Sequence, residues 1–177
     1  MDAIYAFFAT SMMSENIVIS SGEFKHKADA ESAQAIAYSI EKHHKVLELL
    51  IKTPDGMRPY ATGMLEGHSR SEMTIRGHSL AASAKRNNFC SDGWSFVHLS
   101  GTYKWQISNL LGNKWTLSDP SGKVIAAFKH KTWRVRKYGV LRIMENVDDD
   151  LRAVIMLTCD IVRRTVMESE QAAAAGA

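Results

Sequence analysis

The sequence predicts a mainly β protein in which a barrel of short strands surrounds one buried C-terminal helix. Residues 151–162 are apolar almost all round, so a helix there would be buried on most sides instead of presenting one stripe to a core. The preceding sequence, most clearly from residue 95 onward, is a series of short segments separated by turn residues. One buried helix after many strands favours a barrel wrapped around that helix.

The N-terminal segment is apolar, and the sequence leaves its place in the fold open. Apolar side chains recur there at helical spacing and predict a short helix with one apolar face: Ile4, Phe7, Phe8 and Met12. Such a face must cover something, so the segment closes the barrel mouth as a lid, lies on a membrane, or simply adds a strand. Asp2 stands where a secretory signal would carry positive charge, so we expect the segment to remain in the mature protein.

Residues 30–51 fit both a helix and strands. Their apolar side chains form a helical stripe, and many of these residues are good helix formers. Leu47, Leu49 and Ile51 also alternate with their neighbours, as in a strand. Both alternatives stay open on pattern alone. Short strands in the first half are further expected at residues 59–65, 72–76 and 80–85.

The second half contains the clearest strand signals. Residues 103–107 alternate between apolar and polar side chains, which is typical of a half-buried strand. Residues 119–122 predict a turn, because Pro120 presets φ and Gly122 accepts a positive φ. Further strands are expected at residues 115–117, 123–128, 133–136 and 140–144.

The C-terminal helix is expected to start after three acidic residues, 148–150, which would cap its first turn and complement its dipole. Arg163 and Arg164 fit the same scheme near its other end. The apolar run is shorter than the roughly 20 residues that a membrane span needs, and Arg152 and Asp160 interrupt it. No transmembrane segment is therefore expected.

Composition excludes several classes of protein. The formal net charge of +3 permits a mildly anionic partner such as a membrane headgroup, but it is too small to indicate nucleic-acid binding. Cys90 and Cys159 do not make a disulfide framework, so a reducing, intracellular setting fits best.

In their order along the chain, several segments resemble the tubby C-terminal-like superfamily, which includes the LURP-one-related proteins, the phospholipid scramblases and many small fungal proteins. The segments near the C-terminus carry the general resemblance, and the earlier ones are similar to the fungal branch. The segments are residues 38–40, 46–50, 55–56, 60, 91–96, 103–105, 115–128, 131–133, 141–143 and the apolar C-terminal helix.

This resemblance implies a closed antiparallel barrel of about twelve strands around a buried C-terminal helix, and it favours a strand at Leu47. The resemblance covers residues 38–164. We expect a single domain over residues 1–170, which adds the N-terminal segment and the rest of the helix. In that domain residues 1–34 form an extension packed on the barrel, and residues 148–168 form the central helix. Residues 171–177 are low in complexity and are expected to be a disordered tail or a cloning remnant.

A basic patch is the candidate binding site. Tubby proteins bind phosphoinositides through a Lys-x-Arg pair on a strand, and the nearest counterpart here is Arg134 and Arg136. Two residues apart on a strand, they would share one face. The alternative is a solvated strand face or an edge protected by charge. The expected lipid-binding residues are Lys129, Lys131, Arg134, Arg136 and Lys137.

No metal or cofactor is expected. His43 and His44 are adjacent and would face opposite ways on a strand, and no spacing of metal-ligating histidines recurs. The scramblase features, a palmitoylated cysteine-rich segment, an acidic calcium loop and a membrane-crossing end, are also absent from the sequence. The tryptophans are expected to fill the core, with a ligand cavity as the alternative: Trp94, Trp105, Trp115 and Trp133.

We therefore expect a non-enzymatic, tubby-like barrel that binds an anionic phospholipid headgroup or a protein partner at the cytosolic membrane surface. The alternative is a barrel that binds a small apolar ligand and acts as a cofactor-free cyclase or isomerase in a biosynthetic pathway. An outer basic patch favours the first, and a large apolar cavity under residues 1–28 favours the second. The expected location is the cytoplasm, free or peripheral to a membrane.

Overall fold

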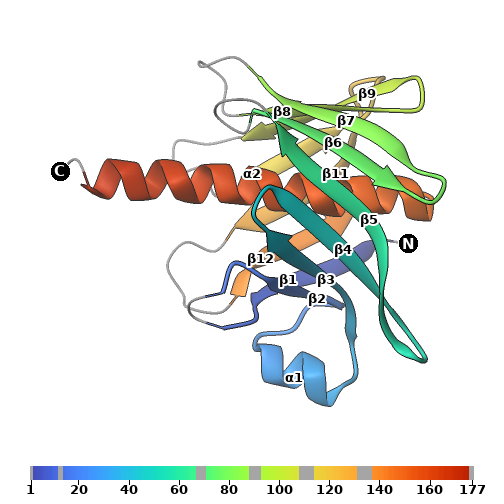
Figure 1. Ribbon diagram of the computed structural model, residues 1–177, viewed down its shortest axis with the longest axis vertical. Coiled ribbons are helices and arrows are strands. Elements are labelled where there is room, and N and C mark those ends of the chain that lie inside the picture. Colours follow the sequence, from blue (N-terminus) through green and yellow to red (C-terminus); the bar gives the residue numbers. More distant parts are fainter. Residues whose placement is uncertain are drawn as a thin grey trace.

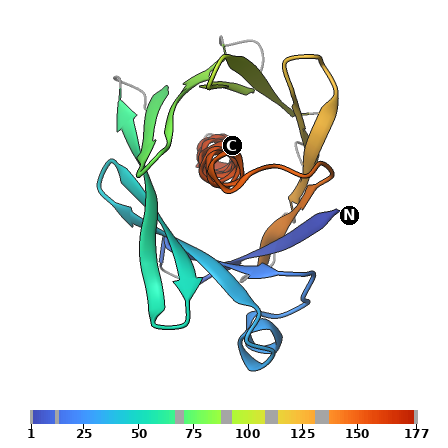
Figure 2. The same cartoon turned by 90° about the vertical axis from the view of Figure 1, so that its right-hand side faces the viewer.

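Twelve antiparallel strands form a closed barrel around one long helix, as predicted (Figure 2). The computed structural model describes residues 2–11, 14–66, 71–87, 93–107, 114–130 and 137–175. The strands are β1 (Ala3–Ala9), β2 (Ile17–Ser21), β3 (Ile36–His43), β4 (Val46–Thr53), β5 (Gly56–Glu66), β6 (Glu72–Gly77), β7 (Ala81–Arg86), β8 (Trp94–His98), β9 (Gly101–Ile107), β10 (Lys114–Ser118), β11 (Val124–His130) and β12 (Lys137–Ile143). Each strand pairs with its neighbours in sequence, and β1 pairs with β12 to close the barrel.

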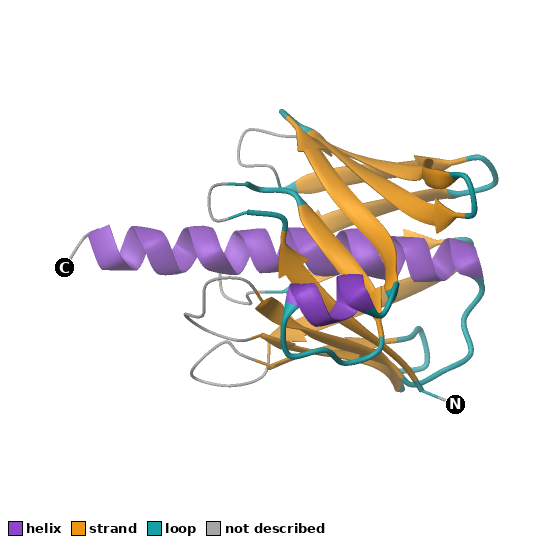
Figure 3. Ribbon diagram, turned by 90° about the horizontal axis from the view of Figure 1, so that it is seen from below, coloured by secondary structure: helices purple, strands orange, loops and turns teal. Residues whose placement is uncertain are grey.

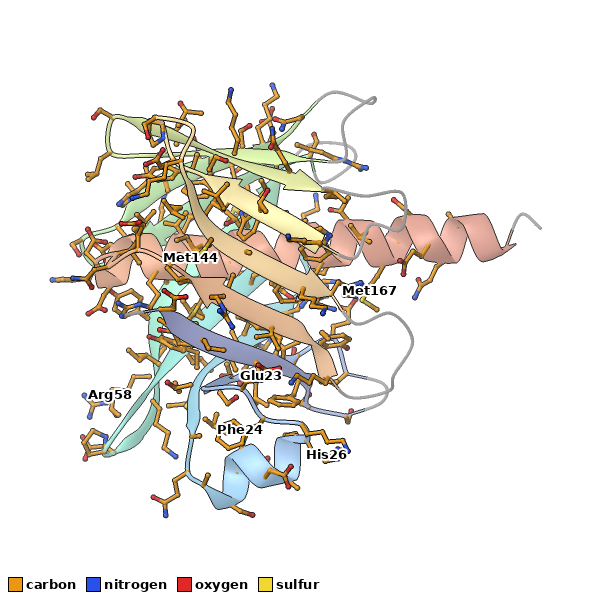
Figure 4. The ribbon with its side chains drawn as sticks, turned by 180° about the vertical axis from the view of Figure 1, so that it is seen from behind. Glu23, Phe24, His26, Arg58, Met144 and Met167 are labelled. Atoms are coloured by element: carbon orange, nitrogen blue, oxygen red, sulfur yellow. The ribbon has the colours of Figure 1, made fainter. Side chains whose placement is uncertain are left out.

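The helix α2 (Asp149–Ala175) runs through the barrel and extends beyond one end of it (Figures 1 and 3). We call the end where α2 begins the proximal end and the end from which it extends the distal end; Met144 and Met167 lie toward these two ends (Figure 4). Residues 153–157 are at most 2% exposed, which confirms the predicted burial on all sides. Barrel side chains and α2 share one continuous core.

The interior tryptophans belong to that core. Trp94, Trp105 and Trp115 are at most 1% exposed and pack in the same cluster as the helix. Trp133 lies outside the described residues. Large inward side chains are what a barrel wall needs to reach a helix on the axis, so the core alternative holds for these three.

The expectation that residues 1–34 form an extension on the barrel, with a helix near its start, is wrong for residues 3–9 and 17–21, which are strands of the wall. Residues 27–32 do pack on the outside of the barrel. Residues of β1 pair with β12 on one side, as in Ala3 with Ile143, and with β2 on the other, as in Phe7 with Ile19. The segment adds a strand, the third of the alternatives open from the sequence. Without β1 the barrel would have two unpaired edges.

The apolar pattern of β1 misleads because both of its faces are covered. Phe7 points into the barrel core, whereas Phe8 lies in a second cluster outside the wall with Ala30. Ala30 belongs to α1 (Lys27–Ser32), which packs against the outer side of the barrel. Phe24 lies beside this helix and packs on the same cluster (Figure 4). A strand covered on both faces loses its alternation, and its apolar residues then imitate helical spacing.

Two more boundaries differ from the expectation. Strands β3 and β4 resolve the ambiguity at residues 30–51 in favour of strands, with only the short α1 before them. The central helix continues to Ala175 instead of ending at 168, so the expected disordered tail is helical through that residue. Alanine has the highest helix propensity, which explains why the Ala-rich end continues the helix. No helix within the described ranges is both long and apolar enough to cross a bilayer.

A hydrogen-bond network anchors the start of α2 in the proximal end. The Asp148 carboxylate accepts from the Leu151 backbone N–H at 2.7 Å, which confirms the predicted cap. Asp150 accepts from the hydroxyls of Tyr60 at 2.9 Å and Ser79 at 2.8 Å, on the surrounding wall. Burial and the bond to Asp150 raise the pKa of Tyr60 to about 12, so its hydroxyl remains a donor at neutral pH.

Candidate functional site

A group of lysines lies on the outer face of β9–β11. Lys104, Lys114 and Lys129 are all exposed, and they alternate with core residues that point inward. The described strands β8–β11 contain no aspartate or glutamate. We call these three lysines the basic wall.

Two residues of the basic wall are held directly opposite each other. Lys114 pairs with Lys129 across β10 and β11, which places their Cβ atoms about 5 Å apart. The next pair, Trp115 and Phe128, stacks inside the barrel with ring centroids 4.7 Å apart. Packing on the inner face therefore fixes the register that sets two lysines opposite each other on the outer face.

The predicted patch is only partly reproduced. Lys129 is exposed and belongs to the basic wall. Lys137 is instead buried: it donates to the Phe24 carbonyl oxygen and lies 5.8 Å from the Phe8 ring centroid. The structure does not bring Lys137 together with Lys129, because the Lys137 ammonium is buried against Phe24, just before α1. The remaining predicted residues, Lys131, Arg134 and Arg136, lie outside the described residues.

Sequence reasoning missed Lys114, although a signal for it was present. The turn at 119–122 joins two strands whose aromatic residues, Trp115 and Phe128, must share the inner face. That pairing sets Lys114 opposite Lys129 one residue further from the turn. Counting back across the hairpin would have found the pair.

Two pairs of glutamates face each other on the opposite side of the barrel. On the outer face of β3–β6, Glu41 pairs with Glu48 and Glu66 pairs with Glu72. The second pair is compensated by a salt bridge between Glu72 and Lys85 at 3.4 Å and by a hydrogen bond from the Thr74 hydroxyl to Glu66. Exposed Lys52, Arg58 and Arg76 lie on the same strands, so this side carries both signs of charge.

Beside the first acidic pair lies a histidine. The Nε2 atom of His43 is 3.5 Å from the Glu41 Oε2 atom. One donor atom from each of Glu41, His43 and Glu48 lies within 4.8 Å of the other two. The expectation of no metal site considered His43 with His44 and overlooked the two glutamates that flank His43 on the same face.

A buried ionic cluster occupies the distal end of the core. Asp160 is fully buried and accepts from Arg163 and Arg164 at 2.7–2.8 Å. Burial by itself would raise the pKa of Asp160, but the two guanidinium groups outweigh it and hold that pKa below its ordinary value. Arg164 also donates to the Glu15 carbonyl oxygen at 2.7 Å, which ties α2 to the β1–β2 connection.

A small pocket lies next to this cluster, between α2 and the barrel rim. Arg164, Lys42 and Arg86 contribute to its lining, and its volume is about 20 Å³. That volume is enough for a water molecule but not for an organic substrate. Arg163 faces the other side, with its guanidinium 4.1 Å from the Tyr138 ring centroid. Among the described residues, the cluster therefore lines only a water-sized space beside the core.

Comparison of the chain with protein-family models, curated proteins and solved structures returned no match. The resemblance to the tubby C-terminal-like superfamily therefore stays a prediction. The barrel with its central helix is established by the structure itself.

Proposed function

We propose that this protein is a non-enzymatic barrel that binds an anionic phospholipid headgroup at the cytosolic membrane surface through the basic wall. The observation that carries the proposal is the facing pair Lys114 and Lys129, on strands that lack acidic residues in their described parts. Lys104 on β9 extends the same face. The wall takes the place of the patch expected from the sequence, with Lys129 common to both.

The geometry of the pair suits a phosphate group. Two lysines directly opposite on adjacent strands place both ammonium groups within reach of one dianionic phosphate. Near a negatively charged membrane each basic residue contributes about 1 kcal/mol, so the pair would strengthen binding by roughly 30-fold. The interaction would weaken as ionic strength rises, because exposed charges are screened by salt.

The interior packing supports a binding role over the cyclase or isomerase alternative. A cofactor-free enzyme would need a shaped cavity of several hundred Å³ with a few polar groups. In the described part of the chain, α2 occupies the barrel axis, and its side chains share one core with the wall. The segment that was expected to close such a cavity, β1, is itself part of the wall.

The proposal is tested by vesicle co-sedimentation with phosphatidylcholine vesicles that do or do not contain phosphatidylserine or a phosphoinositide. Lys114→Ala with Lys129→Ala should reduce binding to the anionic vesicles by at least about tenfold. The control is Lys52→Ala with Lys85→Ala, which removes the same charge from other parts of the outer surface. Equal losses in both double variants would indicate nonspecific attraction, and unchanged binding without Lys114 and Lys129 would refute the proposal.

A further inference from the structure

We propose that Glu41, His43 and Glu48 form a binding site for a divalent transition-metal ion, with Zn²⁺ as the best match. The site lies on the outer face of the β3–β4 hairpin, away from the basic wall. It is independent of the proposed lipid-binding function, and either can fail without the other.

Backbone pairing brings the three side chains together. Glu41 and Glu48 are direct partners across β3 and β4, and His43 is two residues from Glu41, so all three project from one face. The inner face of the same hairpin is fixed by Ile40 and Leu49, which are paired and fully buried. The ligand set is thus presented by a rigid part of the wall.

The spacing fits tetrahedral coordination. With metal–ligand bonds of about 2.0–2.1 Å, two ligands of a tetrahedral zinc ion lie roughly 3.3 Å apart. The His43 and Glu41 donor atoms are 3.5 Å apart, and all three donors lie within 4.8 Å of one another. Small side-chain rotations are sufficient to close the remaining distance to Glu48, and a fourth position stays open for water.

Local charge also favours a cation. Two carboxylates directly opposite on adjacent strands repel each other. Within the described residues, no lysine or arginine forms a salt bridge with either one. Lys42 is engaged with Glu15 at 2.6 Å, and among the described residues the Glu48 side chain makes no hydrogen bond or ion pair. A bound divalent ion would neutralise the pair that the hairpin register enforces.

The donor set selects the class of metal. Ca²⁺ requires six to eight oxygen ligands, and Mg²⁺ prefers an octahedron of oxygens that includes several waters. One imidazole with two carboxylates is instead a ligand set for Zn²⁺, and it would also accept Cu²⁺ or Ni²⁺. Addition of Ca²⁺ or Mg²⁺ is therefore a negative control for the site.

The test is isothermal titration of the untagged full chain with ZnCl₂, together with Co²⁺ absorption as a probe of tetrahedral coordination. We expect one site per chain, an intense visible band with Co²⁺, and an affinity at least about tenfold lower in His43→Ala and in Glu48→Gln. Zinc should also raise the melting temperature of the parent and not of these variants, because an ion that binds the native state stabilises it.

Matched controls are His78→Ala and Glu66→Gln, which remove an exposed histidine and an exposed glutamate elsewhere on the barrel. Both should keep the parental zinc affinity. The proposal is overturned if His43→Ala binds zinc as the parent does, if the controls weaken binding as much, or if the parent shows no saturable binding at millimolar ZnCl₂. Circular dichroism of each variant verifies that the fold is retained before these outcomes are compared.

Discussion

The indole Nε1 of Trp105 on β9 donates a hydrogen bond to the Thr158 hydroxyl on α2 at 2.9 Å, with both residues fully buried. The hydroxyl in turn donates to the Val154 carbonyl oxygen of the same helix at 2.7 Å. Trp105 therefore has a hydrogen-bond partner inside the core, and this polar contact fixes the depth and rotation of the helix within the barrel.

Thr158→Val should destabilise the protein by about 1–3 kcal/mol, because it leaves the Trp105 N–H buried without an acceptor. Trp105→Phe in the Thr158→Val background should cost less than it does in the parent, since the orphaned donor has already lost its bond. Urea unfolding of the two single variants and the double variant measures this coupling. Additive losses would mean that the bond does not set the position of the helix.

Leu157→Asp should cost several kcal/mol, because Leu157 is fully buried and the new carboxylate would have no partner in the apolar core. Leu157→Met, which nearly conserves volume, should cost less than about 1.5 kcal/mol. Thermal unfolding followed by circular dichroism compares the two. A Leu157→Asp variant that melts with the parent would contradict the central position of the helix.

The stability of the distal end should depend on acid through Asp160. Its folded-state pKa lies below the ordinary value of 3.8. The carboxylate therefore contributes its full stabilisation above that value and loses it as the pH falls below about 4 toward the folded pKa. Asp160→Asn should cost roughly 3–5 kcal/mol at neutral pH, because Arg163 and Arg164 would stay buried without a counter-charge.

Urea midpoints measured from neutral pH to about pH 3 check this. The parent should lose stability more steeply than Asp160→Asn in the acid range. Parallel pH profiles would show that Asp160 titrates alike in the folded and unfolded states.

Removal of residues 1–9 should prevent cooperative folding, because β1 closes the barrel between β12 and β2 and contributes Phe7 to the core. Removal of residues 171–177 is the control, since Gln171 and Ala172 are exposed at the helix end, and it should change the melting temperature little. Differential scanning calorimetry distinguishes the two. A cooperative transition in the N-terminal deletion would restore the lid or membrane-foot alternatives.

The barrel and its helix could be predicted because their signals are local. Residues 151–162 are apolar all round, and the hairpin at 119–122 carries both turn residues and alternation. The position of β1 could not be predicted from the sequence. Because α1 covers its outer face, the outward side chains of β1 are apolar too, and the strand shows no alternation of apolar and polar residues. The helix end was placed too early because low complexity was taken for disorder.

The candidate sites depend on the register of strand pairing, because the register decides which side chains face each other. The sequence pattern alone does not define this register. Lys137 belongs to a basic run in the sequence, yet the irregular pairing beside Phe7 and Phe8 turns it under Phe24. Lys114 and Lys129 are fifteen residues apart and meet only once the inner Trp115–Phe128 pair is assigned. Glu41 and Glu48 likewise meet through the turn at His44, whose φ is 54°.

The most direct test of the basic wall is a ¹⁵N–¹H spectrum of the assigned protein with phospholipid nanodiscs that contain phosphatidylserine. We expect that amide signals of β9–β11 around Lys104, Lys114 and Lys129 broaden, that those of β3–β6 do not, and that high salt reverses the effect. Broadening centred on β3–β6, or none at a lipid concentration that sediments the protein, would contradict this expectation.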